Sequence, residues 1–373
     1  MTRVAEKFSI SRLCAGGYLP PRRCQGLTLV ELMISLVLSL LLSAAIVQLF
    51  IGNKQTFRMQ EATARLQENG RFAMEFITRD MRVAGYSGCV LDAENVTNTL
   101  NDRDTSFLWG FSRAVQGFDG GSTNWSPNWT GSAYADFDFD DNPGPAAIAG
   151  TDIITLHAIE GLELKGTQEG NLLSSNPGEA DIEGASDAGI QAGDIIFVTD
   201  CDKAAITQVT GINGNKLQHD DGTSDTPGNS TDTLSHVYAD AEVFKARAVS
   251  YFIALGSGGR PSLWRRIDPG ITEEVVEGVE DMQILYGLAD DVNKWGTVSR
   301  YLTAAELETA NAATAEDLWR QVAAVRFRLL VQSDDNVAEQ AQTYRYDGAA
   351  ITAGDARVRR EFVTTVGVRN RIL

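Results

Sequence analysis

One long apolar run dominates the pattern of hydrophobic and polar positions along the chain. It covers residues 27–51, reads LTLVELMISLVLSLLLSAAIVQLFI, and contains a single formal charge, that of Glu31. As an α-helix this run would be about 37 Å long at 1.5 Å per residue, which is enough to cross a bilayer with some tilt. The pattern therefore predicts a membrane-spanning helix over residues 27–51.

The helical pattern continues beyond the apolar run. There is no proline between residues 53 and 84, and the apolar positions there recur at helical spacing: Ala62, Leu66, Ala73, Ile77, Met81 and Ala84. Two acid-to-base pairs stand four residues apart in the favourable order: Glu61 with Arg65, and Glu75 with Arg79. Gly52 and Gly70 are weak points, since each glycine costs about 1 kcal/mol relative to alanine in a helix. We expect one helix over residues 27–84, its second half lying on a globular body.

After Gly85 the pattern changes to one typical of strands and loops. Short β-branched runs predict strands at residues 152–156, 194–198, 205–209, 325–331 and 361–368. Residues 242–255 and 262–267 read as a hairpin around a Gly-Ser-Gly-Gly-Arg turn, and residues 303–311 as a short helix. Residues 91–150, rich in Asp, Asn, Gly and Ser, are expected to form long loops or a variable insertion. The body, residues 85–373, is thus predicted to be α+β, with the long helix packed on a mostly antiparallel sheet.

Charge is distributed unevenly along the chain. The net charge is −18, but residues 1–26 carry five basic residues against one acidic residue, so the remainder carries −22. An acidic body repels phosphate backbones, and direct nucleic-acid binding is not expected. The basic residues before the apolar run place the N-terminus in the cytoplasm and the body outside.

Glu31 separates three interpretations of the apolar run. A secretory signal would be cleaved after the run at small residues, but the sequence there gives a poor site. A plain signal anchor explains the length but not the carboxylate, which costs roughly 2.5–3.5 kcal/mol in a membrane helix. A cut between Gly26 and Leu27 would create an amine one helical turn from Glu31. In a bundle of parallel helices, Glu31 of one subunit could then neutralise the Leu27 amine of a neighbour.

A stripe of small polar residues follows Glu31 on the same helix. Ser35, Ser39 and Ser43 continue its spacing of four residues, and small residues at such spacing let helices approach closely. Chance is the competing explanation, because serine is common in membrane helices.

The segment from Gly26 to Met33, Gly-Leu-Thr-Leu-Val-Glu-Leu-Met, resembles the class III signal of type IV prepilins and type II secretion pseudopilins. The resemblance implies that prepilin peptidase removes residues 1–26 and methylates Leu27. In that family the first mature residue is usually Phe, so Leu27 is a mild departure. The family's glutamate at the fifth mature position is matched by Glu31.

Further segments resemble the PilW family of minor pilins. They are found at residues 67–74, 79–89, 193–201, 276–287, 319–331 and 368–370, whereas residues 91–150 and 210–235 show no likeness. The resemblance implies a pilin-like fold and a minor pilin that takes part in assembling or priming a type IV pilus. Its implied partners are prepilin peptidase, other minor pilins, the major pilin, the inner-membrane assembly platform and membrane lipid. The implied location is the inner membrane, with the body in the periplasm, and then the pilus or cell surface.

Two alternatives remain open. One is the J-type pseudopilin of type II secretion, which shares the architecture, although a body of this size favours the pilus. The other is a membrane- or pilus-anchored adhesin that binds through residues 91–150. An enzyme is the least favoured class.

The cysteines divide between the two sides of the membrane helix. Cys14 and Cys24 belong to the leader, so Cys89 and Cys201 would be the only thiols of the mature chain in an oxidising space. We expect these two to form a disulfide, with two buried free thiols as the alternative.

No residue pattern predicts a catalytic or cofactor site. No two of His157, His219 and His236 have metal-ligand spacing, and no nucleotide-binding motif is present. Three aspartates alternate as in a calcium loop, at positions 136, 138 and 140, but the glycine and the bidentate glutamate of that loop are missing. No cofactor and no metal are expected.

Overall fold

A computed structural model of the chain describes most of it. The described residues are 28–90, 93–128, 139, 144–165, 179–181, 189–213, 216–222, 226–234, 236, 238, 241–268, 270–289, 297–308 and 312–370. The chain divides into two compact units between Thr56 and Phe57. The division falls inside the first helix, α1 (Leu29–Val83), so the second half of α1 belongs to the body.

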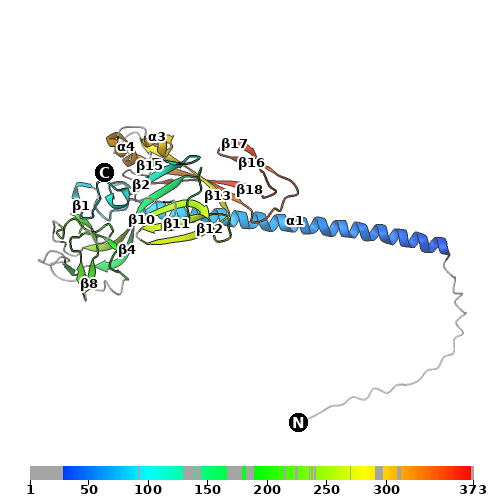
Figure 1. The fold of residues 1–373 in the computed structure, drawn as a ribbon, viewed down its shortest axis with the longest axis horizontal. Helices are drawn as coiled ribbons and strands as arrows, with labels where there is room; N and C mark the ends of the chain where they lie inside the picture. Colours follow the sequence, from blue (N-terminus) through cyan, green and yellow to red (C-terminus); the bar gives the residue numbers. More distant parts are fainter. Residues whose placement is uncertain are drawn as a thin grey trace, which may run out of the picture. The chain divides into compact units, whose positions relative to one another are not determined.

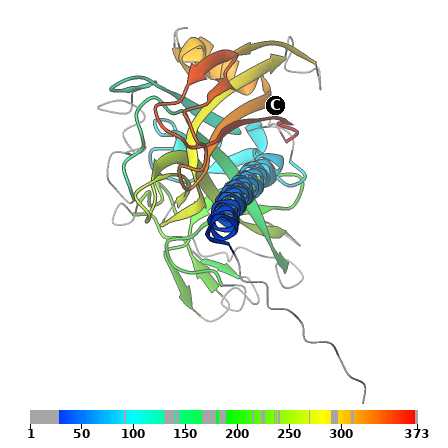
Figure 2. The ribbon, with the colours of Figure 1, turned by 90° about the vertical axis from the view of Figure 1, so that its right-hand side faces the viewer.

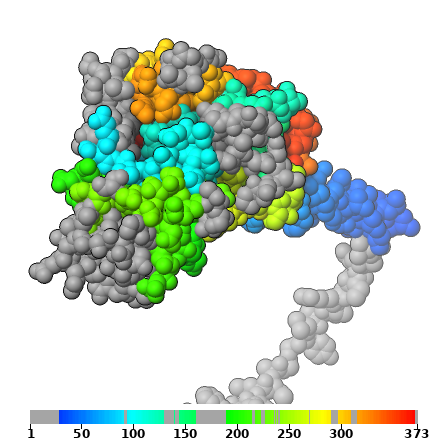
Figure 3. All heavy atoms as spheres, turned by 60° about the vertical axis from the view of Figure 1, so that its left-hand side comes forward, coloured from blue at the N-terminus to red at the C-terminus, as the bar shows by residue number. Residues whose placement is uncertain are grey.

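The body is built around a nine-stranded sheet (Figures 1 and 2). Its strand order is β1-β7-β6-β10-β4-β2-β3, with β11 beside β10 and β12 beside β11. The bounds are β1 (Val96–Asn98), β2 (Val115–Gly120), β3 (Trp125–Ser126), β4 (Ile153–Lys165), β6 (Ile195–Thr199), β7 (Ala204–Gln208), β10 (Glu242–Leu255), β11 (Pro261–Asp268) and β12 (Ile271–Glu277). Among the strand pairs of this sheet that the described residues form, β1–β7 is parallel and the others are antiparallel. In Figure 3 the cyan segment that contains β1 lies against green segments of the β6–β7 region, as this pairing requires.

A second sheet of four antiparallel strands has the order β14-β13-β15-β18. Its strands are β13 (Val279–Ala289), β14 (Val298–Leu302), β15 (Val322–Gln332) and β18 (Arg359–Gly367). Two small sheets pair β16 (Thr343–Tyr346) with β17 (Ala349–Thr352), and β5 (Glu179–Asp181), β9 (Lys216–Gln218) and β8 (Gly211–Asn213) with one another. The short helices are η1 (Ala93–Asn95), α2 (Phe107–Gly110), α3 (Ala304–Glu308) and α4 (Ala312–Arg320).

The α+β prediction is confirmed, as are most of the predicted strands. The β10–β11 hairpin turns at residues 256–260, and α3 lies within the predicted short helix. Residues 91–150, expected to be loops, instead contain β1, β2, β3 and α2, and several of their aromatic side chains are buried: Phe107, Trp109, Phe118 and Trp125. The loop alternative is therefore wrong for these segments, because aromatic residues scattered among turn-forming residues carry no clear period, whereas a variable insertion stays a prediction.

The main core lies between the second half of α1 and the two sheets. Residues at helical spacing on α1 are buried there, namely Leu66, Ala73, Ile77 and Met81. The pair Glu61–Arg65 forms as expected, with 2.9 Å between Oε1 and Nη2. Arg79 instead lies 3.5 Å from Asp80, so the expected pair with Glu75 is not the contact this arginine makes.

Gly70 is explained by packing. It is buried on α1, and a Cβ at this position would overlap the ring of Phe362 on β18. Glycine therefore lets the helix approach the four-stranded sheet more closely than any other residue would. The loss of helix propensity is the cost of this approach.

We expect Gly70→Ala to lower the free energy of unfolding, although alanine is the better helix former by about 1 kcal/mol. Overpacking of this kind typically costs about 1–3 kcal/mol. The check is denaturant unfolding of the full chain in detergent, followed by circular dichroism. Gly52→Ala is the matched control, because a Cβ there meets no atom within 4 Å. Equal or higher stability of Gly70→Ala would contradict the packing argument.

Candidate assembly helix

The apolar helix begins with a side-chain cap. The backbone N–H of Glu31 donates to Oγ1 of Thr28 at 3.3 Å, and the Thr28 hydroxyl lies 3.5 Å from Oε2 of Glu31. Thr-x-x-Glu before an apolar run is the pattern of a capping box, and an acidic residue in the first turn is favoured by the helix dipole. Sequence reasoning missed this role, although the pattern of Thr28 and Glu31 was available to it.

The serine stripe satisfies its hydrogen bonds within the helix. Ser35 and Ser39 donate to the carbonyl oxygens of Leu32 and Leu36, each at 2.9 Å, and Ser43 donates to that of Ser39 at 2.8 Å. The hydroxyls therefore need no partner on a second helix.

The rest of this segment is an exposed apolar surface. Every large hydrophobic side chain from Leu29 to Ile51 is more than half exposed. The helix is long and apolar enough to cross a membrane, and none of its most apolar stretch is buried within the chain. Apolar area of this extent is stable only when lipid or other helices cover it.

A buried ion pair fixes the second half of α1 to the body. Asp80 is 6% exposed and accepts a hydrogen bond of 2.6 Å from the hydroxyl of Tyr251 on β10. Its Oδ2 also lies 2.8 Å from Nη2 of Arg265 on β11. Burial, together with the carboxylate of Asp80, raises the pKa of Tyr251, so the phenol remains a donor.

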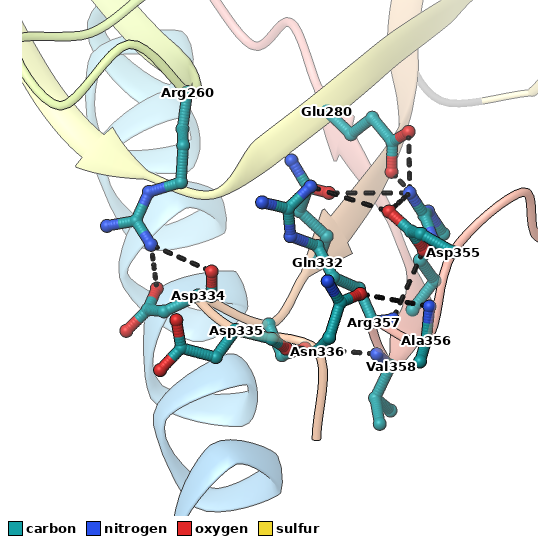
Figure 4. A network of polar contacts seen from close by, with 12 residues as sticks. Arg260, Glu280, Gln332, Asp334, Asp335, Asn336, Asp355, Ala356, Arg357 and Val358 are labelled. Atoms are coloured by element: carbon teal, nitrogen blue, oxygen red, sulfur yellow. Dashed lines mark hydrogen bonds and ion pairs between the residues drawn. The ribbon is translucent and has the colours of Figure 1, made fainter. Parts of the chain in front are cut away.

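Further polar contacts join α1 to the end of β12 and to the loop that follows β15. Figure 4 shows Arg260 reaching Asp334 in that loop. Asn69 donates to the carbonyl oxygen of Glu277 at 3.1 Å, and Nη2 of Arg260 lies 2.6 Å from Oε1 of the same glutamate. Asp334 lies 3.6 Å from Arg260 and 3.7 Å from Arg65. These contacts hold one face of the helix against the end of β12 and the 333–337 loop.

The helix ends at a glycine in the left-handed region. Gly85 has φ +73° and donates its N–H to the carbonyl oxygen of His157 at 2.9 Å. A Cβ there would collide with the carbonyl oxygen of Asn370. Glycine after the last helical turn is the usual C-terminal stop, and here it also permits a close backbone contact.

A disulfide follows the helix end. Cys89 and Cys201 are bonded, which confirms the expected pair, and their Cα atoms are 5.0 Å apart. Cys201 lies in the turn between β6 and β7, where the neighbouring Asp200 accepts from Nε2 of His236 at 2.8 Å. The bond spans 112 residues, and closing such a loop stabilises by about 4–5 kcal/mol in the chain-entropy model.

His157 is buried where this part of the body meets the helix end. Its ring is stacked between Phe107 and Phe111, with both centroid distances 4.1 Å. Nδ1 lies 2.8 Å from the carbonyl oxygen of Arg113, to which it donates, whereas Nε2 is buried without a partner. Burial lowers the pKa of His157 to about 4, so the ring is neutral in the folded protein.

We expect His157 to make the body acid-sensitive. Because its pKa falls from 6.5 in the unfolded chain to about 4 in the folded chain, its contribution is complete above pH 6.5 and is lost as the pH falls toward 4. The loss is on the order of 3 kcal/mol. Unfolding of the parent and of His157→Asn, which keeps a donor near the Nδ1 position, should be compared at each pH between 7 and 4.

The difference between the parent and His157→Asn at each pH isolates the contribution of His157, because the other titrating groups are the same in both proteins. Burial raises the pKa of Asp152 to about 8, so protonation of Asp152 stabilises the folded state as the pH falls and acts against His157. Equal pH dependence of the parent and of His157→Asn would contradict the assignment.

Several residues singled out in the sequence lie outside the described part of the chain. These are Cys14, Cys24, Gly26 and Leu27 at the N-terminus and the three alternating aspartates at positions 136, 138 and 140. Among the residues that the structure does describe, no three His, Cys, Asp or Glu side chains form a group that could hold a metal ion.

Comparison with known proteins gives two matches. Residues 21–47 match the prokaryotic N-terminal methylation motif, and residues 250–370 match the family described as type IV pilus-assembly protein W. No curated protein and no solved structure matches. The first match contains the capped start of α1, and the second contains β11 to β18 and the arginine that pairs with Asp80. Together with the long N-terminal helix on a mostly antiparallel body, these two matches support a type IV minor pilin of the PilW family.

Proposed function

We propose that this protein is a minor pilin that takes part in assembling or priming a type IV pilus. The observation that carries the proposal is the apolar helix at residues 29–51, whose large hydrophobic side chains are all more than half exposed, in a chain whose body has a large core of its own. A membrane covers such a surface before assembly, and neighbouring pilin helices cover it in a filament.

Processing would prepare the helix for assembly. Prepilin peptidase would cut between Gly26 and Leu27 and methylate the Leu27 amine. The carboxylate of Glu31 would then neutralise the amine of a neighbouring subunit and fix the axial position of one helix against the next. Ser35, Ser39 and Ser43 would line a face on which helices can approach closely.

The topology follows from the charges around the helix. The basic leader would remain in the cytoplasm while the body crosses to the periplasm, where the Cys89–Cys201 disulfide can form. The partners proposed for the mature protein are other minor pilins, the major pilin and the inner-membrane assembly platform. After assembly the body would lie on the pilus.

The test is a deletion strain complemented with the full chain. The proposal predicts few or no pili in the deletion strain, restored pili on complementation, and the mature protein in small amounts in sheared pili. Normal pilus number in the deletion strain would contradict a role in assembly or priming.

Two other functions have distinct outcomes in the same strains. A J-type pseudopilin of type II secretion would leave pili unchanged and abolish export of secreted enzymes. An adhesin would leave both unchanged and reduce attachment to surfaces. The pilus assignment is preferred because residues 250–370 match a pilus-assembly family.

A further inference from the structure

The four-stranded sheet has one long regular edge, formed by β18. Its pairing with β15 runs without a bulge from Arg359 to Gly367. The opposite edge, β14, is short, and its pairing is interrupted by a register shift at Ala289. Natural edge strands are commonly shortened, bulged or broken by proline to prevent pairing with other chains, and β18 has none of these features.

The phase of the hydrogen bonds shows which groups face outward. Val368 donates its N–H to the carbonyl oxygen of Ala323 at 2.8 Å. In an antiparallel pair every second residue bonds to the neighbouring strand, so the backbone groups of Phe362, Thr364 and Val366 bond to β15, as that of Val368 does. The N–H and C=O groups of the residues between them, Val363, Thr365 and Gly367, point away from the sheet. Among the described residues no backbone hydrogen bond reaches these outward groups.

One end of this edge is covered and the other is open. The β16–β17 hairpin lies beside the start of β18, where the N–H of Asp347 donates to Glu361 at 3.1 Å (Figure 1). Beyond it Val363 is 54% exposed, and Thr365 and Gly367 are exposed as well. Six outward-facing backbone groups thus form a template for one additional strand.

Charge indicates what kind of strand fits. From β15 onward, residues 322–373 carry eight arginines against six acidic residues, a net of +2, whereas residues 27–321 carry −24. Arg359 is neutralised by ion pairs with Glu280 and Asp355. Arg360 and Arg369, at the two ends of the open edge, are exposed and have no ion pair within the described part of the chain.

We propose that the open edge of β18 at Val363–Gly367 binds an extended acidic strand of a different polypeptide by β-strand addition. The outward N–H and C=O groups would pair with the backbone of that strand, and its carboxylates would reach Arg360 and Arg369. This surface belongs to the body and does not depend on the assembly helix, so the proposal can fail or hold independently of the proposed function.

The test uses two pools of nine-residue peptides on the immobilised full chain in detergent. One pool has Asp or Glu at its end positions on both faces of the strand and Val, Ile or Thr elsewhere, and the matched pool has Lys at the acidic positions. We expect retention of the acidic pool to exceed that of the basic pool by at least about tenfold, which corresponds to ~1.4 kcal/mol. Equal retention, or no retention of the acidic pool, would overturn the proposal.

A proline at position 365 distinguishes backbone pairing with the β18 edge from peptide binding elsewhere on the protein. The N–H of Thr365 points outward, so Thr365→Pro removes a donor for the partner strand while leaving the bonds to β15 intact. Retention should fall to background in Thr365→Pro and stay at the parent level in Thr365→Ala. Thermal unfolding checks that Thr365→Pro is folded. A folded Thr365→Pro that still retains the acidic peptides would contradict the proposal.

A charge-reversed variant keeps the test decisive if the proline variant does not fold. Arg360→Glu combined with Arg369→Glu should reverse the preference toward the basic pool. Unchanged preference would show that the two arginines do not select the strand. Analytical sedimentation of the parent and of both Thr365 variants tests for self-association. If the parent and Thr365→Ala self-associate and Thr365→Pro does not, the edge binds a second copy of this chain, which would overturn the assignment to a different polypeptide.

Discussion

Replacing Glu31 with alanine is expected to remove the protein from pili while leaving its body folded. The residue lies in the first turn of the exposed apolar helix, in a compact unit separate from the body, and its hydrogen bonds are to Thr28. We therefore expect the body to fold without it. Assembly should depend on it, because an unneutralised Leu27 amine at the helix interface would cost several kcal/mol. The measurement is the amount of mature protein in sheared pili relative to membranes, which should fall by at least about tenfold.

The cap at the start of the helix requires its own control. Glu31 also contacts Thr28 within the same chain, so loss of assembly could arise from a frayed helix. Thr28→Ala removes the capping hydroxyl, at a typical cost of about 1 kcal/mol, but keeps the carboxylate and should still assemble. Glu31→Gln keeps the shape without the charge and should fail. Failure of Thr28→Ala together with assembly of Glu31→Gln would assign Glu31 to the cap rather than to the subunit contact.

Asp80→Ala is expected to cause the largest loss of stability in the body. The substitution leaves the guanidinium of Arg265, 16% exposed, without its closest carboxylate and removes the acceptor of the Tyr251 hydroxyl. Breaking a buried pair from one side typically costs about 3–5 kcal/mol. Arg265 keeps a second carboxylate, that of Glu273 at 3.3 Å, so we expect a value near the lower end. Denaturant unfolding of the full chain in detergent measures it.

Arg79 supplies the matched control on the same helix. Its guanidinium is 63% exposed and lies 3.5 Å from Asp80, so Arg79→Ala should change the free energy of unfolding by less than about 1 kcal/mol. Asp80→Asn keeps the size and one acceptor and should be intermediate. A cost below about 1 kcal/mol for Asp80→Ala would show that the network does not hold α1 on the body.

Strong local patterns made much of the fold predictable. The apolar run and the helical spacing after it gave α1 to within two residues at its start and one at its end. Runs of β-branched residues located β6, β7, β10 and β15. The disulfide followed from topology, because only two thiols would reach the oxidising side.

Other features depend on contacts between segments that are distant in the sequence. Gly70 weakens the helix by its propensity, and its role in close packing is visible only from its contact with Phe362, almost 300 residues later. The sequence gives no sign that Asp80 differs from an exposed surface charge, whereas in the structure it binds both Tyr251 and Arg265. The histidine at position 157 has no sequence signal for its place between two phenylalanine rings, since those rings lie about 50 residues earlier. The helix cap formed by Thr28 and Glu31, by contrast, could be predicted from the spacing of these two residues.

The start of the mature chain tests the central claim most directly, since every assembly contact proposed for the helix requires a cut before it. Intact mass and N-terminal sequencing of the protein purified from its own membranes should show a chain that begins at a methylated Leu27. A chain that begins at Met1, or at a residue beyond Ile51, would contradict the account.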